Sequence, residues 1–304
     1  MPNWGEVLKE IIQYSNDKGV GLARSADDIR KEYLKKLNEY SQKNIISYYS
    51  GWLQNPGIEG TDINDDDKNG FMMAIHGMDC SRGLDLILHT PGGGVTATES
   101  IIDYLHRKFG DNIRILVPQI AMSAGTMIAC SGKEIVMGKQ SNLGPIDPQF
   151  RGVPAHGVVE EFKRAFKEIK KDPAKLSVWQ FILQKYNPTF LTECENAIAL
   201  SEEFVLQNLE KVMFKNDKDK KNKALKVVKY LTAYKDRKAH ARHINIDECK
   251  KMGLKIVDLE SDQQLQDLVL TVHHCYMHTL GNTNTLKVIE NHSGATMARM
   301  FAMQ

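Results

Sequence analysis

The sequence predicts an α/β protein built on parallel strands, and three short apolar runs carry that prediction. The runs are LDLILH (Leu84–His89), IRILVP (113–118) and EIVM (Glu134–Met137). The first is followed by a turn of small residues and a helical segment to about Phe109, and the second by a similar turn and helix over 123–131. A repeated order of strand, turn and helix is typical of parallel strands joined by helical crossovers.

Helical segments flank this core on both sides. Residues 1–43 are rich in Lys, Glu and Leu at helical spacing and form a helical N-terminal lead-in. We assign 44–260 to one central domain, with a helical insertion at 158–243. Within that domain, 246–254 is predicted as a short helix and 256–259 as a strand. The last region, 261–304, is predicted as a long C-terminal helix followed by a tail.

Charge and composition exclude several classes of partner. The chain has 40 basic and 38 acidic side chains, a net charge of +2, which argues against a whole-protein affinity for nucleic acid or an anionic membrane. The basic stretch 211–243 is predicted to be a solvated helical face. No run of about 18 apolar residues predicts a membrane span. Five scattered cysteines without a CxxC pair, and no secretory leader pattern at the start, predict a cytoplasmic protein with reduced thiols.

An acidic loop precedes the first apolar run. Residues 55–70 contain Pro56, three glycines and the cluster Asp62, Asp65, Asp66 and Asp67. We expect a solvated acidic surface there rather than a Ca²⁺ site, because the glutamate that an EF-hand loop needs at its twelfth position is missing. The pair His274 and His278 lacks a third ligand, so no metal and no cofactor are predicted.

Two turns carry the candidate chemistry: PGGG at 91–94 and MSAG at 122–125. Each follows an apolar strand and precedes a helix, and positions 92 and 123 lie 31 residues apart, which is room for one crossover. If the two strands are parallel neighbours, their carboxyl ends open on one edge, about 5 Å apart. Ligand sites in parallel α/β sheets form at that edge.

The residue types in these turns suit acyl transfer. Such an enzyme stabilises an oxyanion with converging backbone N–H donors. Here the donors would be Gly92 or Gly93 from one turn and Ala124 from the other, with Ser123 as the nucleophile. A plainer alternative stays open from spacing alone, in which PGGG is only a turn and Ser123 only a helix N-cap. No G-x-G-x-x-G, Walker-type or G-x-S-x-G motif is present, so nucleotide binding and the α/β-hydrolase elbow are disfavoured.

At these residues the sequence resembles the serine dehydrogenase proteinase family, relatives of Clp protease and signal peptide peptidase A. The matching stretches are YYSGW (48–52), GLDLILHTPGGG (83–94), AMSAGTMIACSGKEIVMG (121–138) and LGPIDPQ (143–149), with a weaker match at IDECKKMGL (246–254). The likeness covers most of residues 30–260.

The resemblance implies a Clp/crotonase-like fold, a spiral of β-β-α units, and a tendency to form homo-oligomers. It also implies a serine peptidase that acts on a peptide or protein substrate without ATP or a cofactor. In that reading Ser123 is the nucleophile, and Gly92, Gly93 and Ala124 shape the oxyanion hole.

The general base is the open part of the resemblance. The histidine of Clp proteases would fall within about a residue of Asp147, so this sequence lacks it there. His240 matches a histidine that recurs in the family and could pair with Ser123, with Asp147 orienting its ring. Lys163 lies near the spacing of a signal-peptide-peptidase-like dyad, but a lysine base requires burial.

Two other functions remain compatible with the same residues. A crotonase-like acyl-CoA enzyme would use the same oxyanion hole without covalent catalysis. A catalytically inactive oligomeric scaffold or sensor would keep the fold alone.

Overall fold

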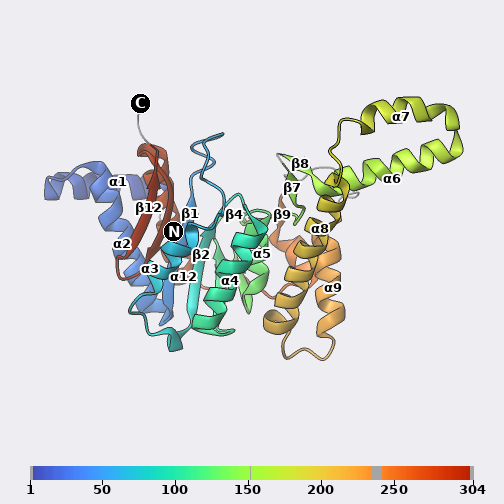
Figure 1. The fold of residues 1–304 in the computed structure, drawn as a ribbon. Coiled ribbons are helices and arrows are strands. Elements are labelled where there is room, and N and C mark those ends of the chain that lie inside the picture. The colour runs from blue at the N-terminus through green and yellow to red at the C-terminus, as the bar shows by residue number, and fades with distance from the viewer. Residues whose placement is uncertain (1–2, 151, 234–241, 302–304) are drawn as a thin grey trace.

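The computed structural model describes residues 3–150, 152–233 and 242–301 (Figure 1). A seven-stranded sheet forms the centre, and five of its strands run parallel. In spatial order they are β10 (Ile256–Asp258), β5 (Glu134–Met137), β3 (Ile113–Val117), β2 (Leu84–His89), β1 (Asn44–Ser50), β11 (Thr285–Asn291) and β12 (Thr296–Met300). The predicted mixed α/β fold with parallel strands is confirmed.

The three apolar runs occupy neighbouring positions in this sheet. β2 pairs in parallel with β3, and β3 pairs in parallel with β5. The crossover from β2 to β3 is α4 (Val95–Phe109), and the one from β3 to β5 is α5 (Ala124–Ser131). The carboxyl ends of β2 and β3 therefore open on one edge, as the spacing of the two turns predicts.

Helices cover both faces of the sheet because alternate residues of each strand point to opposite sides. On β1, Ile46 and Tyr48 pack toward one group of helices, and Ile45 and Tyr49 toward the other. The first group includes α3 (Asp67–Ile75), α4, α5, α8 (Phe190–Asn208), α9 (Lys220–Leu231) and α11 (Ile246–Met252). The second group is α2 (Leu22–Ser41) and α12 (Gln263–Asn282), with α1 (Trp4–Lys18) packed against them.

The C-terminal region contains more structure than the helix and tail that we predicted. After α12, β11 pairs antiparallel with β1, and β12 pairs antiparallel with β11. A buried ion pair joins this added edge to the N-terminal helices, since Arg30 Nε donates to Glu290 Oε2 at 2.7 Å. The tail is therefore part of the central sheet.

Two small sheets and a helical hairpin complete the fold. β4 (Ile120–Ala121), β6 (Asn142–Leu143) and β9 (Ile244–Asn245) form one sheet, and β7 (Gln149–Phe150) and β8 (Val153–Pro154) form the other. The hairpin consists of α6 (Ala155–Lys171), a 3-10 turn (Pro173–Lys175) and α7 (Leu176–Leu183), and it extends away from the body (Figure 1). None of the helices in the described ranges has the length and apolar character needed to cross a bilayer.

Candidate active site

The two predicted turns meet at the carboxyl edge of the sheet. The Met122 N–H donates to the Thr90 carbonyl at 3.0 Å, which joins the chain after β3 to the end of β2. Gly92 has φ +99°, and a Cβ placed on it would lie 2.8 Å from Ser123 Cβ and 3.0 Å from the Ala124 nitrogen. Contacts that short leave no space for a side chain, so glycine is required where the two turns touch.

Ser123 stands on a strained turn between strand and helix. Its φ of 51° and ψ of −115° are unusual for a residue with a side chain, and such strain costs on the order of 1–3 kcal/mol. Ser123 precedes α5 but makes no side-chain capping hydrogen bond. The hydrogen bond expected of a serine that acts only as an N-cap is therefore not made by this side chain. Its side chain is half-buried at the wall of a cavity.

In the described ranges, two backbone N–H groups of the touching turns have no protein acceptor, that of Gly93 in the PGGG turn and that of Ala124, which follows Ser123. The neighbouring groups are engaged. The Gly92 N–H donates to Thr90 Oγ1 at 3.2 Å, and the Gly94 N–H donates to the Ile63 carbonyl at 2.8 Å. Because Ala124 opens α5, its N–H also lies at the positive end of the helix dipole. The arrangement suits an anion.

The cavity beside Ser123 has a volume of about 480 Å³. Its polar groups include Ser123, the glycines of the PGGG turn and Asp147. Apolar side chains make much of the remaining wall, and they come from the α4 and α5 helices, the 143–150 segment and α8: Val95, Met127, Ile146, Phe150, Ala197 and Leu200. The helical insertion at 158–243 therefore forms part of the cavity wall through α8.

Thr126 fixes the position of the segment that carries Asp147. Its Oγ1 lies 2.9 Å from the Ala121 carbonyl and 2.9 Å from the Gly144 carbonyl, and it accepts the Gly144 N–H at 2.9 Å. All of these atoms are buried. The SAGT and LGPIDPQ motifs are therefore held together by one hydroxyl, and the Ser123 turn and Asp147 both line the same cavity.

Asp147 is buried and paired with a histidine that the sequence analysis missed. His156 Nδ1 lies 2.8 Å from Asp147 Oδ1, and the His156 backbone N–H donates to the same oxygen at 3.3 Å. The β7–β8 hairpin turns the chain back so that the first turn of α6 meets Asp147. One weak signal for this pair is present in the sequence, a histidine nine positions after Asp147.

The two predicted bases have different outcomes. His240 lies outside the described residues. Lys163 lies on α6 with two-thirds of its side chain exposed, 3.5 Å from Glu160 Oε1, and neither it nor His156 is among the described residues that line the cavity beside Ser123. The burial that would favour a neutral lysine is absent there.

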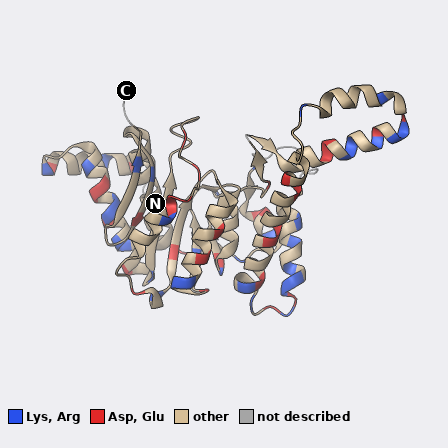
Figure 2. Ribbon diagram, viewed as in Figure 1, with Lys and Arg blue, Asp and Glu red and all other residues tan. Residues whose placement is uncertain are grey.

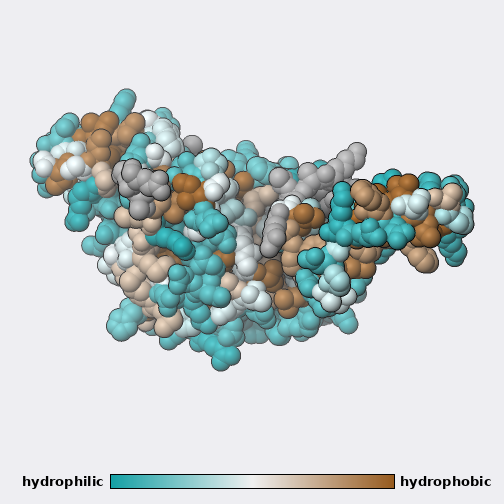
Figure 3. Space-filling view, turned by 45° about the horizontal axis from the view of Figure 1, so that its top comes forward, coloured by the Kyte–Doolittle hydropathy of each residue, from teal (hydrophilic) through white to brown (hydrophobic). Residues whose placement is uncertain are grey.

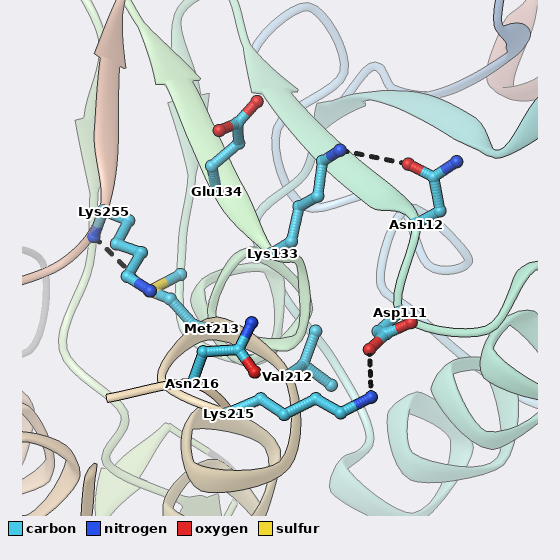
Figure 4. A pocket seen from close by; sticks show the side chains of 9 residues that line it. All are labelled: Asp111, Asn112, Lys133, Glu134, Val212, Met213, Lys215, Asn216 and Lys255. Carbon is cyan, nitrogen blue, oxygen red and sulfur yellow. Dashed lines mark hydrogen bonds and ion pairs between the residues drawn. The ribbon is translucent and has the colours of Figure 1, made fainter. Parts of the chain in front are cut away.

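A second hollow, of about 440 Å³, lies at the opposite edge of the sheet (Figure 4). Its lining residues include Asp111 and Asn112 before β3, Lys133 before β5 and Lys255 before β10. Figure 4 shows an ion pair between two of these residues, Lys215 and Asp111, at 2.6 Å. No serine or cysteine is among the described residues that line this hollow, so we place the candidate active site at the carboxyl edge.

The comparison with known families agrees with this geometry. The model of the family described as ClpP-like SDH-type serine proteinase matches residues 27–291. The chain belongs to this family. The match spans the central sheet from α2 to β11 and includes both turns of the candidate site. The resemblance drawn from the sequence motifs is confirmed, whereas the spiral arrangement of the units stays a prediction.

Two archaeal proteins of Methanocaldococcus jannaschii are similar to this chain. Uncharacterized protein MJ0137 is 28% identical over 225 residues, which cover 74% of this chain and 69% of that protein. Uncharacterized protein MJ1495 is 28% identical over 194 residues, which cover 64% of this chain and 59% of that protein. Neither name specifies a reaction.

Proposed function

We propose that this member of the family is a serine peptidase that cleaves peptide bonds through an acyl-enzyme on Ser123. The observation that supports this most is the contact of the two turns. There a half-buried serine on a strained turn lines one cavity together with the PGGG turn, and the N–H groups of Gly93 and of the following Ala124 have no protein acceptor among the described residues. A serine whose side chain makes no capping hydrogen bond, next to two available N–H donors, suits nucleophilic attack on a carbonyl.

The oxyanion would bind to the N–H groups of Gly93 and Ala124. Gly92 was an alternative donor on sequence grounds, but its N–H is engaged by Thr90 Oγ1. Gly92 instead provides the space in which the two turns approach each other. Loss of one such donor costs about 3–4 kcal/mol of transition-state stabilisation in acyl-transfer enzymes.

We assign the proton transfer to the Asp147–His156 pair. Asp147 contacts Nδ1 of the imidazole, which holds the tautomer whose lone pair is on Nε2. In the substrate complex Nε2 takes the proton of Ser123 as Oγ forms a bond to the carbonyl carbon, and it returns that proton to the leaving amine. Water then hydrolyses the ester. The carboxylate stabilises the imidazolium that forms in each half-reaction.

His240 and Lys163 remain competing bases, and the crotonase-like and inactive alternatives remain rivals. A peptide or protein substrate, a cytoplasmic location and a homo-oligomer are part of this proposal. The reaction as proposed uses no metal, ATP or other cofactor.

Labelling with a fluorophosphonate probe, followed by mass-spectrometric mapping of the modified residue, tests the proposal. The variants to compare are Ser123→Ala, His156→Ala, Asp147→Asn, His240→Ala and Lys163→Ala, together with hydrolysis of casein. We expect the wild type to be labelled on Ser123 and Ser123→Ala to lose both labelling and hydrolysis. We expect His156→Ala to slow labelling by about 10²-fold or more, with Lys163→Ala unchanged.

Other results would contradict parts of the proposal. Full-strength labelling of Ser123→Ala would remove the nucleophile assignment. Loss of labelling in His240→Ala, with His156→Ala normal, would transfer the base to His240. Wild-type protein that neither reacts with the probe nor cleaves casein would favour the inactive scaffold. CoA binding with full activity in Ser123→Ala would favour the crotonase-like enzyme.

A further inference from the structure

The α6–α7 hairpin, residues 155–183, presents large apolar side chains to solvent. Phe166 is 72% exposed, Phe181 69%, and Val178 61%. In α7 only Trp179 is buried, and the main contacts of α7 are with α6 and the turn between the two helices. Figure 3 shows the hairpin standing out from the body with hydrophobic residues on its surface. A helix that packs on so little of its own chain is typical of an interaction surface.

The same hairpin has a surplus of positive charge near its tip. Residues 163–175 contain six Lys or Arg and two Asp or Glu, a net charge of +4. Figure 2 shows basic residues along α6 and at the turn toward α7. Arg164 and Lys175 pair with Glu168. Lys167, Lys170 and Lys171 are exposed and make no ion pair with any residue that the structure describes.

A surface of opposite character lies elsewhere on the chain, in the loop of residues 51–66. This loop contains Glu59, Asp62, Asp65 and Asp66 and no Lys or Arg, a net charge of −4. The four carboxylates are exposed, and among the described side chains none forms an ion pair with them. The loop also exposes Leu53 and Ile58. It thus matches the hairpin in both charge and apolar character.

Within one chain, the α6–α7 hairpin extends away from this loop, which lies above β1 and β2 (Figure 1). We infer that the hairpin of one copy docks on the acidic loop of a second copy. The charges of +4 and −4 steer the encounter, and the exposed apolar residues of both surfaces are buried in the contact.

This docking has a consequence at the cavity beside Ser123. Asp62 of the loop lines that cavity, and Ile63 is bonded through its backbone to Gly92 and Gly94. A hairpin seated on the loop would therefore lie at the cavity rim and form part of the substrate path. This consequence rests on the proposed peptidase function, whereas the docking itself does not.

Sedimentation velocity of the full chain over a concentration series at 0.1 M and 1 M NaCl tests the docking. One variant reverses the hairpin (Lys167→Glu, Lys170→Glu, Lys171→Glu) and another reverses the loop (Glu59→Lys, Asp65→Lys, Asp66→Lys). We expect each to weaken self-association at 0.1 M NaCl by about tenfold or more. The variant carrying both reversals should regain association, and 1 M NaCl should weaken it in the wild type.

A matched control reverses three exposed lysines at the start of α9 (Lys218→Glu, Lys220→Glu, Lys221→Glu) and should associate like the wild type. Circular dichroism confirms that each variant is folded. A wild type that is monomeric at all concentrations would overturn the docking. Loss of association in the hairpin variant but not in the loop variant would also overturn it. A combined variant that does not regain association would do the same. If association behaves as expected but no hydrolysis is found, only the proposed peptidase function fails.

Discussion

At the scale of single residues, the site depends on a glycine whose role is spatial. Gly92 combines a positive φ with a contact in which an added Cβ would meet Met122 O at 2.7 Å and Ser123 Cβ at 2.8 Å. Backbone at that distance is not a flexible neighbour that can move aside. The side-chain-free position is what lets the strained serine and the available N–H groups converge.

Gly92→Ala should therefore abolish activity while leaving a folded protein. Gly77 provides the control, because it also has a positive φ of 77° but nothing within 4 Å of the added Cβ. Gly77→Ala should cost about 1–2 kcal/mol of stability from backbone strain alone and keep the reactivity of Ser123. Probe labelling and urea unfolding of both variants give the comparison. Equal reactivity in the two variants would show that the two turns need not touch.

At the scale of elements, the site is assembled from segments that contribute one group each. The turn after β2 brings the glycines, the turn into α5 brings Ser123, and the root of α6 brings His156. The Asp147 segment is placed by Thr126 of α5 through its bonds to Gly144. The geometry therefore depends on contacts between elements as much as on their own conformations.

Thr126→Val tests this dependence, since valine keeps the shape and removes the hydroxyl. The buried Gly144 N–H would lose its acceptor, which should cost about 1–3 kcal/mol of stability. The loosened Asp147 segment should also slow probe labelling. Thr126→Ser retains the hydroxyl and should restore most of the labelling rate. If the valine variant labels as fast as the wild type, the bond has no part in placing Asp147.

At the scale of the whole molecule, buried ionisable groups join strands of the central sheet to the helices that cover it. Lys287 on β11 pairs with Asp67 at the start of α3 at 2.8 Å, and both are fully buried. Asp67 also accepts the Tyr48 hydroxyl at 2.8 Å. We predicted a solvated acidic cluster for this region, and for Asp67 that prediction is wrong. Its neighbours Asp62, Asp65 and Asp66 do face solvent.

The folded protein should lose stability in mild acid because of buried histidines. Burial lowers the pKa of His89 to about 4, and it lowers the pKa of His273 well below its ordinary value. As the pH falls below about 6.5, the unfolded chain binds a proton that the folded chain does not bind. The free energy of unfolding therefore decreases down to about pH 4. His89 alone should lower the free energy of unfolding by about 2 kcal/mol between pH 7 and pH 5.

Urea unfolding at pH 7 and pH 5 measures this loss. The variant His89→Gln should show a smaller difference between the two pH values, while His76→Gln, which changes an exposed histidine, should match the wild type. An unchanged difference in His89→Gln would show that His89 does not carry the acid sensitivity.

Much of the fold, and the turn that bears Ser123, follow from local pattern. The runs of β2, β3 and β5 are mostly apolar, apart from charged residues such as Asp85, Arg114 and Glu134, because a parallel sheet is buried on both faces, and that shows directly in the sequence. The small-residue turns after two of them mark the carboxyl edge. Their spacing of one crossover was enough to place Ser123 beside Gly92, because neighbouring parallel strands leave few alternatives.

The sequence by itself thus determined the sheet core and the turn that bears Ser123, whereas the tertiary structure decided which groups surround that serine. The Asp147–His156 pair depends on a hairpin that reverses the chain, and the place of β11 depends on pairing with β1 across more than two hundred residues. The exposure of the α6–α7 hairpin likewise depends on where the body ends. Contacts between distant segments are set by packing of the whole chain, and no local periodicity encodes them.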